Sequence, residues 1–74
     1  MEQRIKYNPK DYVDYLEESM TLFAEAMQAG DVFLMEYAWR RMYNDTKQAM
    51  KEGMLSPKDR DDMLFYYDDL IPHA

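Results

Sequence analysis

The chain has 74 residues and no cysteine, and fifteen acidic against nine basic side chains give it a net charge of −6. A domain of this size buries only about three fifths of the surface of its unfolded chain, so a monomer is expected to be marginally stable. The lack of cysteine excludes disulfides, thiolate catalysis and cysteine-based metal sites, and the acidic balance argues against general affinity for phosphate backbones or anionic membranes.

Apolar residues make up 47% of the chain and charged residues 32%, a composition typical of one globular domain over residues 1–74. The first ten residues contain no apolar core of signal-peptide length. The longest apolar runs, 32–35 and 63–67, are too short to cross a bilayer. We therefore expect a cytoplasmic protein without a membrane partner.

A first helix is predicted over residues 9–29, after an N-terminal arm of residues 1–7. Asn8 can cap free amides at its start, and Pro9 suits the first helical position because it has no amide to leave unpaired. Gly30 is placed to end the helix in a left-handed conformation. Apolar residues recur between these ends at intervals of three and four, namely Val13, Leu16, Met20, Phe23 and Met27.

A second helix is predicted over residues 32–52, capped by Asp31 and closed by Gly53. Because Asp31 directly follows Gly30, the first two helices should fold back as an antiparallel hairpin. The inward face predicted for this helix contains Val32, Met35, Ala38, Trp39, Met42, Ala49 and Met50, with Tyr43 at its edge.

Ser56 and Pro57 repeat the start signal and predict a third helix over residues 57–71, which Pro72 stops before a frayed tail of residues 72–74. Three helices joined by short loops predict an all-α, compact three-helix bundle in up-down-up order. Its predicted centre consists of Met20, Phe23, Met27, Met35, Trp39, Met42, Met63, Tyr67 and Leu70.

The second helix carries more apolar residues than two neighbours require. Phe33 and Tyr37, four residues apart, run into an arginine pair, which is the composition of an interface hot spot. Three explanations stay open: the N-terminal arm with Ile5 and Tyr7, or the C-terminal tail, covers this surface; two copies of the chain pair through it; or another protein binds it. The predicted binding residues here are Phe33, Leu34, Tyr37, Arg40, Arg41 and Asn44.

Arg40, Lys47 and Lys51 form a basic row on the same helix that could contact nucleic acid. Acidic residues lie nearby in the sequence and the whole chain repels phosphate, so a solvated lysine face is the favoured interpretation.

The third helix places Phe65 away from its core face and surrounds it with carboxylates. This surface could engage a basic patch on another protein, including a nucleic-acid-binding groove that it would block by imitating phosphates. Alternatively, the acidic face serves only solubility. The predicted binding residues on this helix are Asp61, Asp62, Phe65, Asp68 and Asp69.

Catalysis is difficult to assign to these residues. His73 is the single histidine and follows a proline near the chain end, while Ser19 and Ser56 have no plausible base. A metal site built from Asp68, Asp69 and His73 would take its only nitrogen ligand from the tail. We expect no enzyme, no metal and no cofactor.

The leading hypothesis is a small acidic helical protein that binds another protein stoichiometrically as a regulator, adaptor or inhibitor. Compact acidic proteins of this kind are frequent among phage and mobile-element products that disable host machinery, and the hypothesis includes that origin. The alternative is a homo-oligomeric structural component, with a homodimer as its simplest form. A nucleic-acid-binding protein using the basic row is the third possibility.

Overall fold

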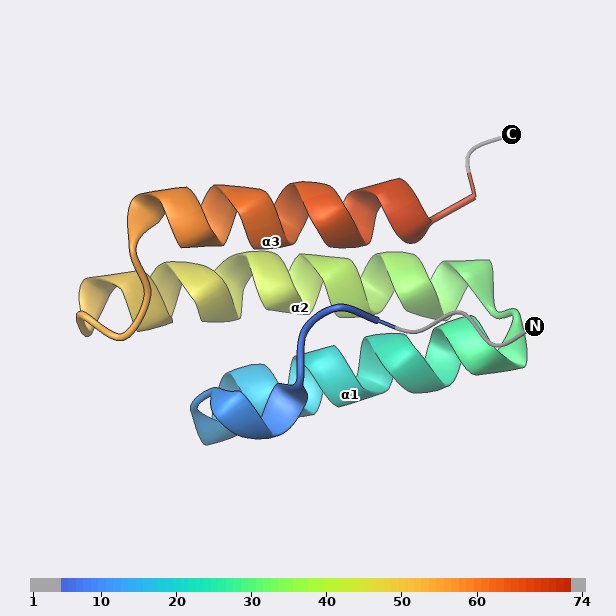
Figure 1. Cartoon of the computed structure of the whole chain (residues 1–74). Coiled ribbons are helices and arrows are strands. Elements are labelled where there is room, and N and C mark those ends of the chain that lie inside the picture. Colours follow the sequence, from blue (N-terminus) through green and yellow to red (C-terminus); the bar gives the residue numbers. More distant parts are fainter. Residues whose placement is uncertain (1–4, 73–74) are drawn as a thin grey trace.

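The computed structural model describes residues 5–72 and shows three α-helices in up-down-up order (Figure 1). The elements are a short 3-10 helix, η1 (Pro9–Asp11), followed by α1 (Asp14–Ala29), α2 (Val32–Lys51) and α3 (Pro57–Leu70). The predicted all-α three-helix bundle with short loops is confirmed. Within residues 5–72, no helix is both long and apolar enough to span a membrane.

The first α-helix begins later than the sequence signal indicates. Asn8 caps a helical turn as predicted, its side chain accepting a hydrogen bond of 3.1 Å from the amide of Lys10, but that turn is only η1. Tyr12 and Val13 are extended and half-buried, and α1 starts at Asp14 without a side-chain cap. The predicted start at residue 9 is wrong, because packing of Tyr12 and Val13 against the core overrides the local helix-start signal.

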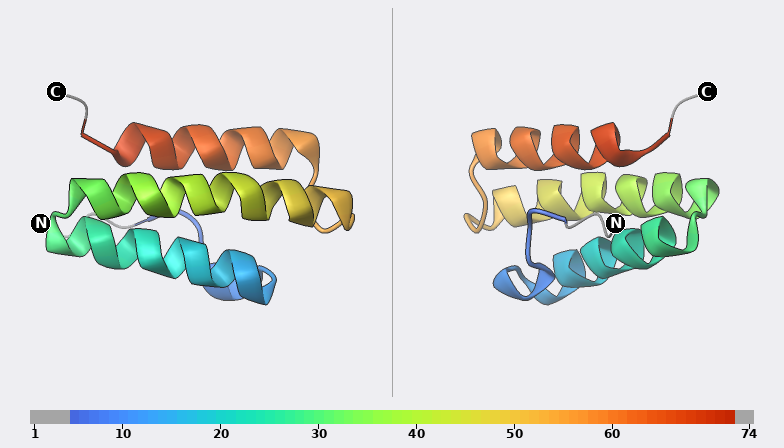
Figure 2. Two further views of the ribbon diagram at one scale, coloured as in Figure 1. Left: turned by 180° about the vertical axis from the view of Figure 1, so that it is seen from behind. Right: turned by 45° about the vertical axis from the view of Figure 1, so that its right-hand side comes forward.

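The α1–α2 connection has the predicted short form (Figure 2). Gly30 is left-handed, with φ of 71°, and the amide of Asp31 donates to the carbonyl of Ala26 at 2.9 Å. The Asp31 carboxylate then accepts the amide of Leu34 at 3.0 Å and so caps α2. One glycine and one aspartate therefore reverse the chain.

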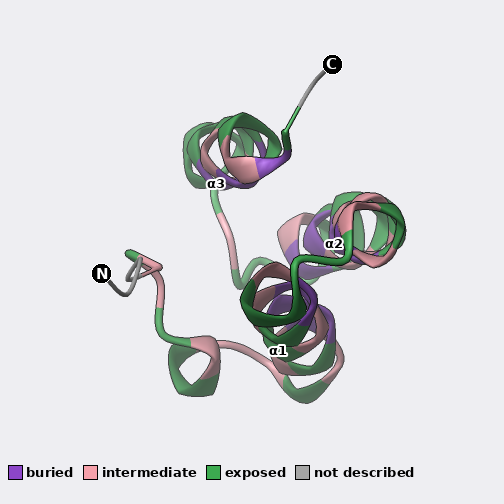
Figure 3. Cartoon of the chain, turned by 90° about the vertical axis from the view of Figure 1, so that its right-hand side faces the viewer, coloured by how far each residue is buried: buried purple, intermediate pink, exposed green. Residues whose placement is uncertain are grey.

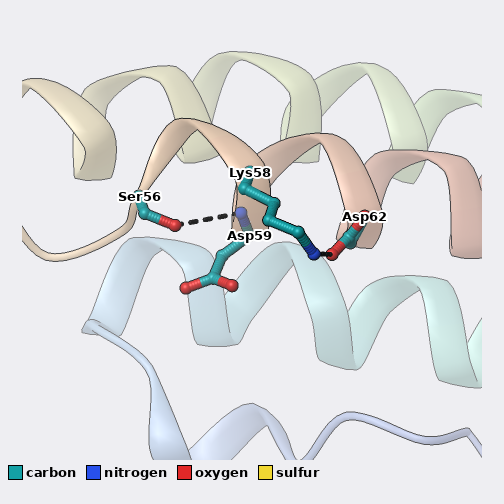
Figure 4. A network of polar contacts seen from close by, with 4 residues as sticks. All are labelled: Ser56, Lys58, Asp59 and Asp62. Carbon is teal, nitrogen blue, oxygen red and sulfur yellow. Dashed lines mark hydrogen bonds and ion pairs between the residues drawn. The ribbon is translucent and has the colours of Figure 1, made fainter.

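The start of α3 also follows its predicted signal (Figure 4). The Ser56 hydroxyl accepts a hydrogen bond of 3.0 Å from the amide of Asp59, and Pro57 occupies the first helical position. Lys58 and Asp62 form an ion pair of 2.9 Å one turn later. The hydrogen bond and the charge attraction between the Lys58 ammonium group and the Asp62 carboxylate raise the pKa of Lys58.

The core is built from one inward stripe of each helix. Met27, Trp39 and Leu70, predicted at the centre, are instead half-buried at its edges. Two hydroxyl residues are also fully buried. The Ser19 hydroxyl donates to the carbonyl of Leu16 and the Thr46 hydroxyl to that of Met42, so both groups are satisfied inside their own helices. The core cluster contains Leu16, Met20, Phe23, Ala26, Met35, Ala38, Met42, Met63, Leu64, Tyr67 and Ile71.

The N-terminal segment supplies the fourth side of the bundle (Figure 3). No Cα atom of α1 comes within 8 Å of one in α3, and the described part of the arm runs beside the space between them. The ring of Tyr7 lies 5.3 Å from that of Tyr66 and 6.0 Å from that of Tyr67, and the amide of Lys6 donates to the Tyr66 hydroxyl at 2.7 Å. Residues 5–7 of the arm are therefore part of the fold.

Candidate protein-binding surfaces

The outer side of α2 exposes two large aromatic side chains. Phe33 is 86% exposed and Tyr37 53%, and Arg40 and Asn44 are exposed beside them. At spacings of three and four residues these side chains share one face, opposite the buried face of Met35, Ala38 and Met42. We call the four residues Phe33, Tyr37, Arg40 and Asn44 the α2 outer face.

Two residues predicted for this surface lie elsewhere. Leu34 is half-buried and packs against the core. Arg41 is half-buried and turns toward α1, where its guanidinium lies 3.8 Å from the Glu18 carboxylate. Both positions lie on the flank of α2 that meets α1, and so they support the helix pair.

Covering of the α2 outer face by Ile5 and Tyr7 of the arm is contradicted by the structure. Ile5 packs against the core and Tyr7 contacts Tyr66 and Tyr67, while Phe33 and Tyr37 stay exposed. The Tyr7 ring instead fills space beside α3. Of the C-terminal tail, Pro72 is exposed, and residues 73–74 lie outside the described part of the chain.

The predicted basic row continues the α2 outer face toward the end of the helix. Arg40, Lys47 and Lys51 are all exposed and form no ion pair within residues 5–72. Glu52, the nearest acid at that end, instead accepts a hydrogen bond from the Tyr15 hydroxyl, which raises the pKa of Tyr15 to about 12. The surface is thus aromatic at one end and cationic at the other.

The outer side of α3 has the acidic character that its sequence predicts. Phe65 is 75% exposed, and all four neighbouring aspartates, Asp61, Asp62, Asp68 and Asp69, are exposed as well. Lys58 pairs with Asp62 and reduces the negative charge at the start of the helix. Phe65 forms a ridge between two hollows, one shared with Tyr7 and Tyr66 and the other shared with α2.

The hollow between α2 and α3 was missed by sequence reasoning. It has a volume of about 380 Å³ and is walled by aromatic rings from both helices. The spacing of Trp39 and Tyr43, four residues apart on the flank of α2 that faces α3, was the available signal. We call this site the aromatic hollow; its lining consists of Trp39, Tyr43, Arg60, Asp61, Leu64, Phe65 and Asp68.

Directional contacts fix the walls of the aromatic hollow. The Trp39 indole N–H donates to the carbonyl of Leu64 at 2.9 Å, and the Trp39 and Tyr43 ring centroids are 5.8 Å apart. The Arg60 guanidinium lies over the Tyr43 ring at 4.6 Å and donates to the Tyr43 carbonyl and the Thr46 hydroxyl, each at 3.2 Å. These contacts hold α3 on α2 in one register.

The residues considered for chemistry are not assembled into a site. Ser19 is buried against its own helix and Ser56 is the cap of α3. Over residues 5–72, no three acidic or histidine side chains are grouped to hold a metal ion. His73 lies outside the described residues, and the absence of enzymatic activity remains a prediction.

Comparisons with known proteins provide no information on function, so a functional proposal must be based on the residues described above. No protein-family model matches the chain, and neither the curated proteins nor the solved structures gave a match.

Proposed function

We propose that this protein is a binding module that acts stoichiometrically on another protein as a regulator, adaptor or inhibitor. The supporting observation is the exposure of Phe33 and Tyr37 on the α2 outer face. Other aromatic side chains of the arm and of the three helices pack in or against the core, as Tyr7, Phe23, Trp39 and Tyr67 do. Burying one such side chain contributes about 1.5–3 kcal/mol, and aromatic residues beside an arginine are the usual energetic centre of an interface.

Affinity capture from cells of the source organism tests this proposal. The double variant Phe33→Ala, Tyr37→Ala should lose the partner that the wild type captures, since truncation of an interface centre costs about 2 kcal/mol or more per residue. Met54→Ala is the matched control, because Met54 is 60% exposed but lies in the α2–α3 loop, away from this face. Equal capture by both folded variants and the wild type would contradict the proposal.

Stoichiometric action requires a defined complex. Native mass spectrometry of the captured material should give one fixed ratio of this chain to its partner. A partner that is chemically altered and released, without a stable complex, would point to catalysis.

A homodimer through the α2 outer face is the second candidate. Phe33 and Tyr37 lie in line along one helix, so two antiparallel copies of α2 could bury the same face twice across a two-fold axis. The segment 32–52 has four basic and three acidic side chains, a balance of +1 that lessens repulsion between copies. Light scattering should then report a dimer that Phe33→Ala, Tyr37→Ala converts to monomer, whereas a monomer at high concentration excludes it.

A further inference from the structure

We propose that the aromatic hollow between α2 and α3 receives a cationic side chain, with arginine preferred over lysine, from a basic segment of a partner protein. This inference rests on the proposed function, since it assumes a protein partner, but it uses a surface distinct from the α2 outer face.

The hollow is lined by aromatic side chains, which are the kind of group that binds a cation. Trp39 and Tyr43 come from α2 and Phe65 from α3, so a side chain entering between the helices meets aromatic rings on two sides. Phe65 is 75% exposed and makes no ring contact within residues 5–72. A cation over an aromatic face is attracted by the ring quadrupole, and the attraction is stronger when the cation is desolvated.

The chain already places one guanidinium in this position. Arg60 lies 4.6 Å from the Tyr43 centroid, and its hydrogen bonds to Thr46 and the Tyr43 carbonyl keep it at one end of the hollow. The volume of about 380 Å³ that remains is bordered by Phe65 and Trp39. An arginine side chain of a partner can therefore make the same guanidinium–aromatic contact in this remaining space.

Charge selects a cation over other ligands. Asp61 also lines the hollow, while the lining guanidinium of Arg60 is already held by Tyr43 and Thr46; residues 57–71 carry five acidic against two basic side chains, a balance of −3. An incoming arginine can pair with the Asp61 carboxylate through its planar fork while it stacks on an aromatic ring. A lysine can make the charge contact but stacks less well, and an acidic segment is repelled.

Trp39 provides a direct assay because it is the only tryptophan of the chain and lies in the hollow. We would titrate the purified protein with blocked peptides of equal length that alternate glycine with arginine, lysine or glutamate. A saturable change in Trp39 fluorescence is expected with the arginine peptide, a weaker one with the lysine peptide, and none with the glutamate peptide.

Variants identify the binding groups. Phe65→Ala should weaken binding of the arginine peptide about three- to tenfold, the loss of one cation–π partner. Asp61→Asn should weaken it and reduce its dependence on salt, since one charge pair is lost. Phe33→Ala, Tyr37→Ala is the matched control and should bind the peptide like the wild type.

The outcomes separate the two proposals. Absence of a saturable change with the arginine peptide, or binding unaffected by Phe65→Ala, would overturn a cation site in the hollow even if Phe33 proves essential for capture. Peptide binding without any captured partner would instead overturn the proposed function. If Trp39 fluorescence of the protein alone changes with its concentration, and Phe65→Ala abolishes the change, the occupant is a second copy and the assignment to a foreign partner is wrong.

Discussion

α1 and α3 are attached to α2 by different kinds of contact. The α1–α2 pair is joined by a two-residue turn and shares an apolar core in which Ala26 and Ala38 are fully buried, so the two backbones lie close together. α3 is held on α2 by a smaller core contribution and by directional bonds from Trp39 and Arg60.

The difference separates the packing that stabilises the bundle from the surface that we propose as a binding site. Close apolar packing resists any insertion, because interiors are already at crystal-like density. Aromatic and polar contacts at the α2–α3 junction fix the register of α3 without filling the surface, and the aromatic hollow remains there. The α2–α3 junction therefore combines a fixed register with an open hollow lined by aromatic side chains.

The largest effect is expected from Phe23→Ala, which weakens both attachments. Phe23 is fully buried in α1, and its ring lies 4.8 Å from that of Tyr67 in α3. Loss of a buried phenylalanine costs about 3–5 kcal/mol, a large part of the stability of so small a domain. The urea midpoint should fall by the same amount whether unfolding is followed by circular dichroism or by Trp39 fluorescence. A shift in only one signal would show that α1 and α3 unfold separately.

Arg60→Met tests the attachment of α3 alone. Methionine keeps most of the aliphatic stem but removes the bonds to Thr46 and to the Tyr43 carbonyl. Because hydrogen bonds to charged groups contribute about 1.5–3 kcal/mol and Arg60 is only half-buried, we expect a loss near the lower limit. Lys58→Met is the control: its exposed ion pair with Asp62 should leave the urea midpoint almost unchanged. Equal losses in the two variants would contradict a specific role for Arg60.

Tyr67→Phe is expected to stabilise the protein by up to about 1 kcal/mol, because an unpaired buried hydroxyl is unfavourable. Tyr67 is fully buried, and its hydroxyl has no hydrogen-bond partner in the described part of the chain. Thermal unfolding near neutral pH measures the change. Destabilisation would show that the hydroxyl has a partner.

The same variant should reduce the loss of stability in alkali. Burial raises the pKa of Tyr67 above its usual 10, and burial also raises that of Tyr12. Above pH 10 the unfolded chain releases these protons while the folded chain retains them, so stability falls as pH rises. Tyr67→Phe removes one of these titrating groups, so the fall in the free energy of unfolding with pH should be less steep by at most about 1.4 kcal/mol per pH unit. Urea midpoints of the wild type and the variant, measured at several alkaline pH values, check this. If Tyr67 ionises freely in the folded protein, both proteins would lose stability equally as the pH rises.

The smallest effect is expected from Phe33→Ala, Tyr37→Ala, whose side chains contribute little to the folded monomer. Substitutions at such exposed positions usually change stability by less than about 0.5 kcal/mol. Calorimetry of a dilute sample checks this. A much larger loss would mean that the α2 outer face is buried in a dimer even when dilute.

Helix ends and inward stripes could be predicted from the sequence because their causes are local. Gly30, Asp31 and Ser56 act within four residues of themselves, and the spacing of apolar residues defines each inward face. The first helix start was misplaced because the burial of Tyr12 depends on Tyr7 and the core, which no local signal reports.

The candidate surfaces also divide into one kind that depends on a single helix and one kind that depends on how two helices pack. The exposure of Phe33, Tyr37 and Phe65 could be predicted because each lies opposite an inward stripe of its own helix. The aromatic hollow could not, since it requires the register of α3 on α2. That register is set by Arg60 and Trp39, and their partners are 14 and 25 residues away along the chain.

The bond from the amide of Lys6 to the Tyr66 hydroxyl joins residues 60 positions apart and has a consequence for the order of folding. The α1–α2 turn closes a very short loop and can form early, whereas contact of the arm with α3 must close nearly the whole chain and carries the larger entropic penalty. During synthesis, the arm has no tyrosine partners on α3 until α3 has been made. Docking of the arm therefore completes folding, although it contains the first described residues to be synthesised.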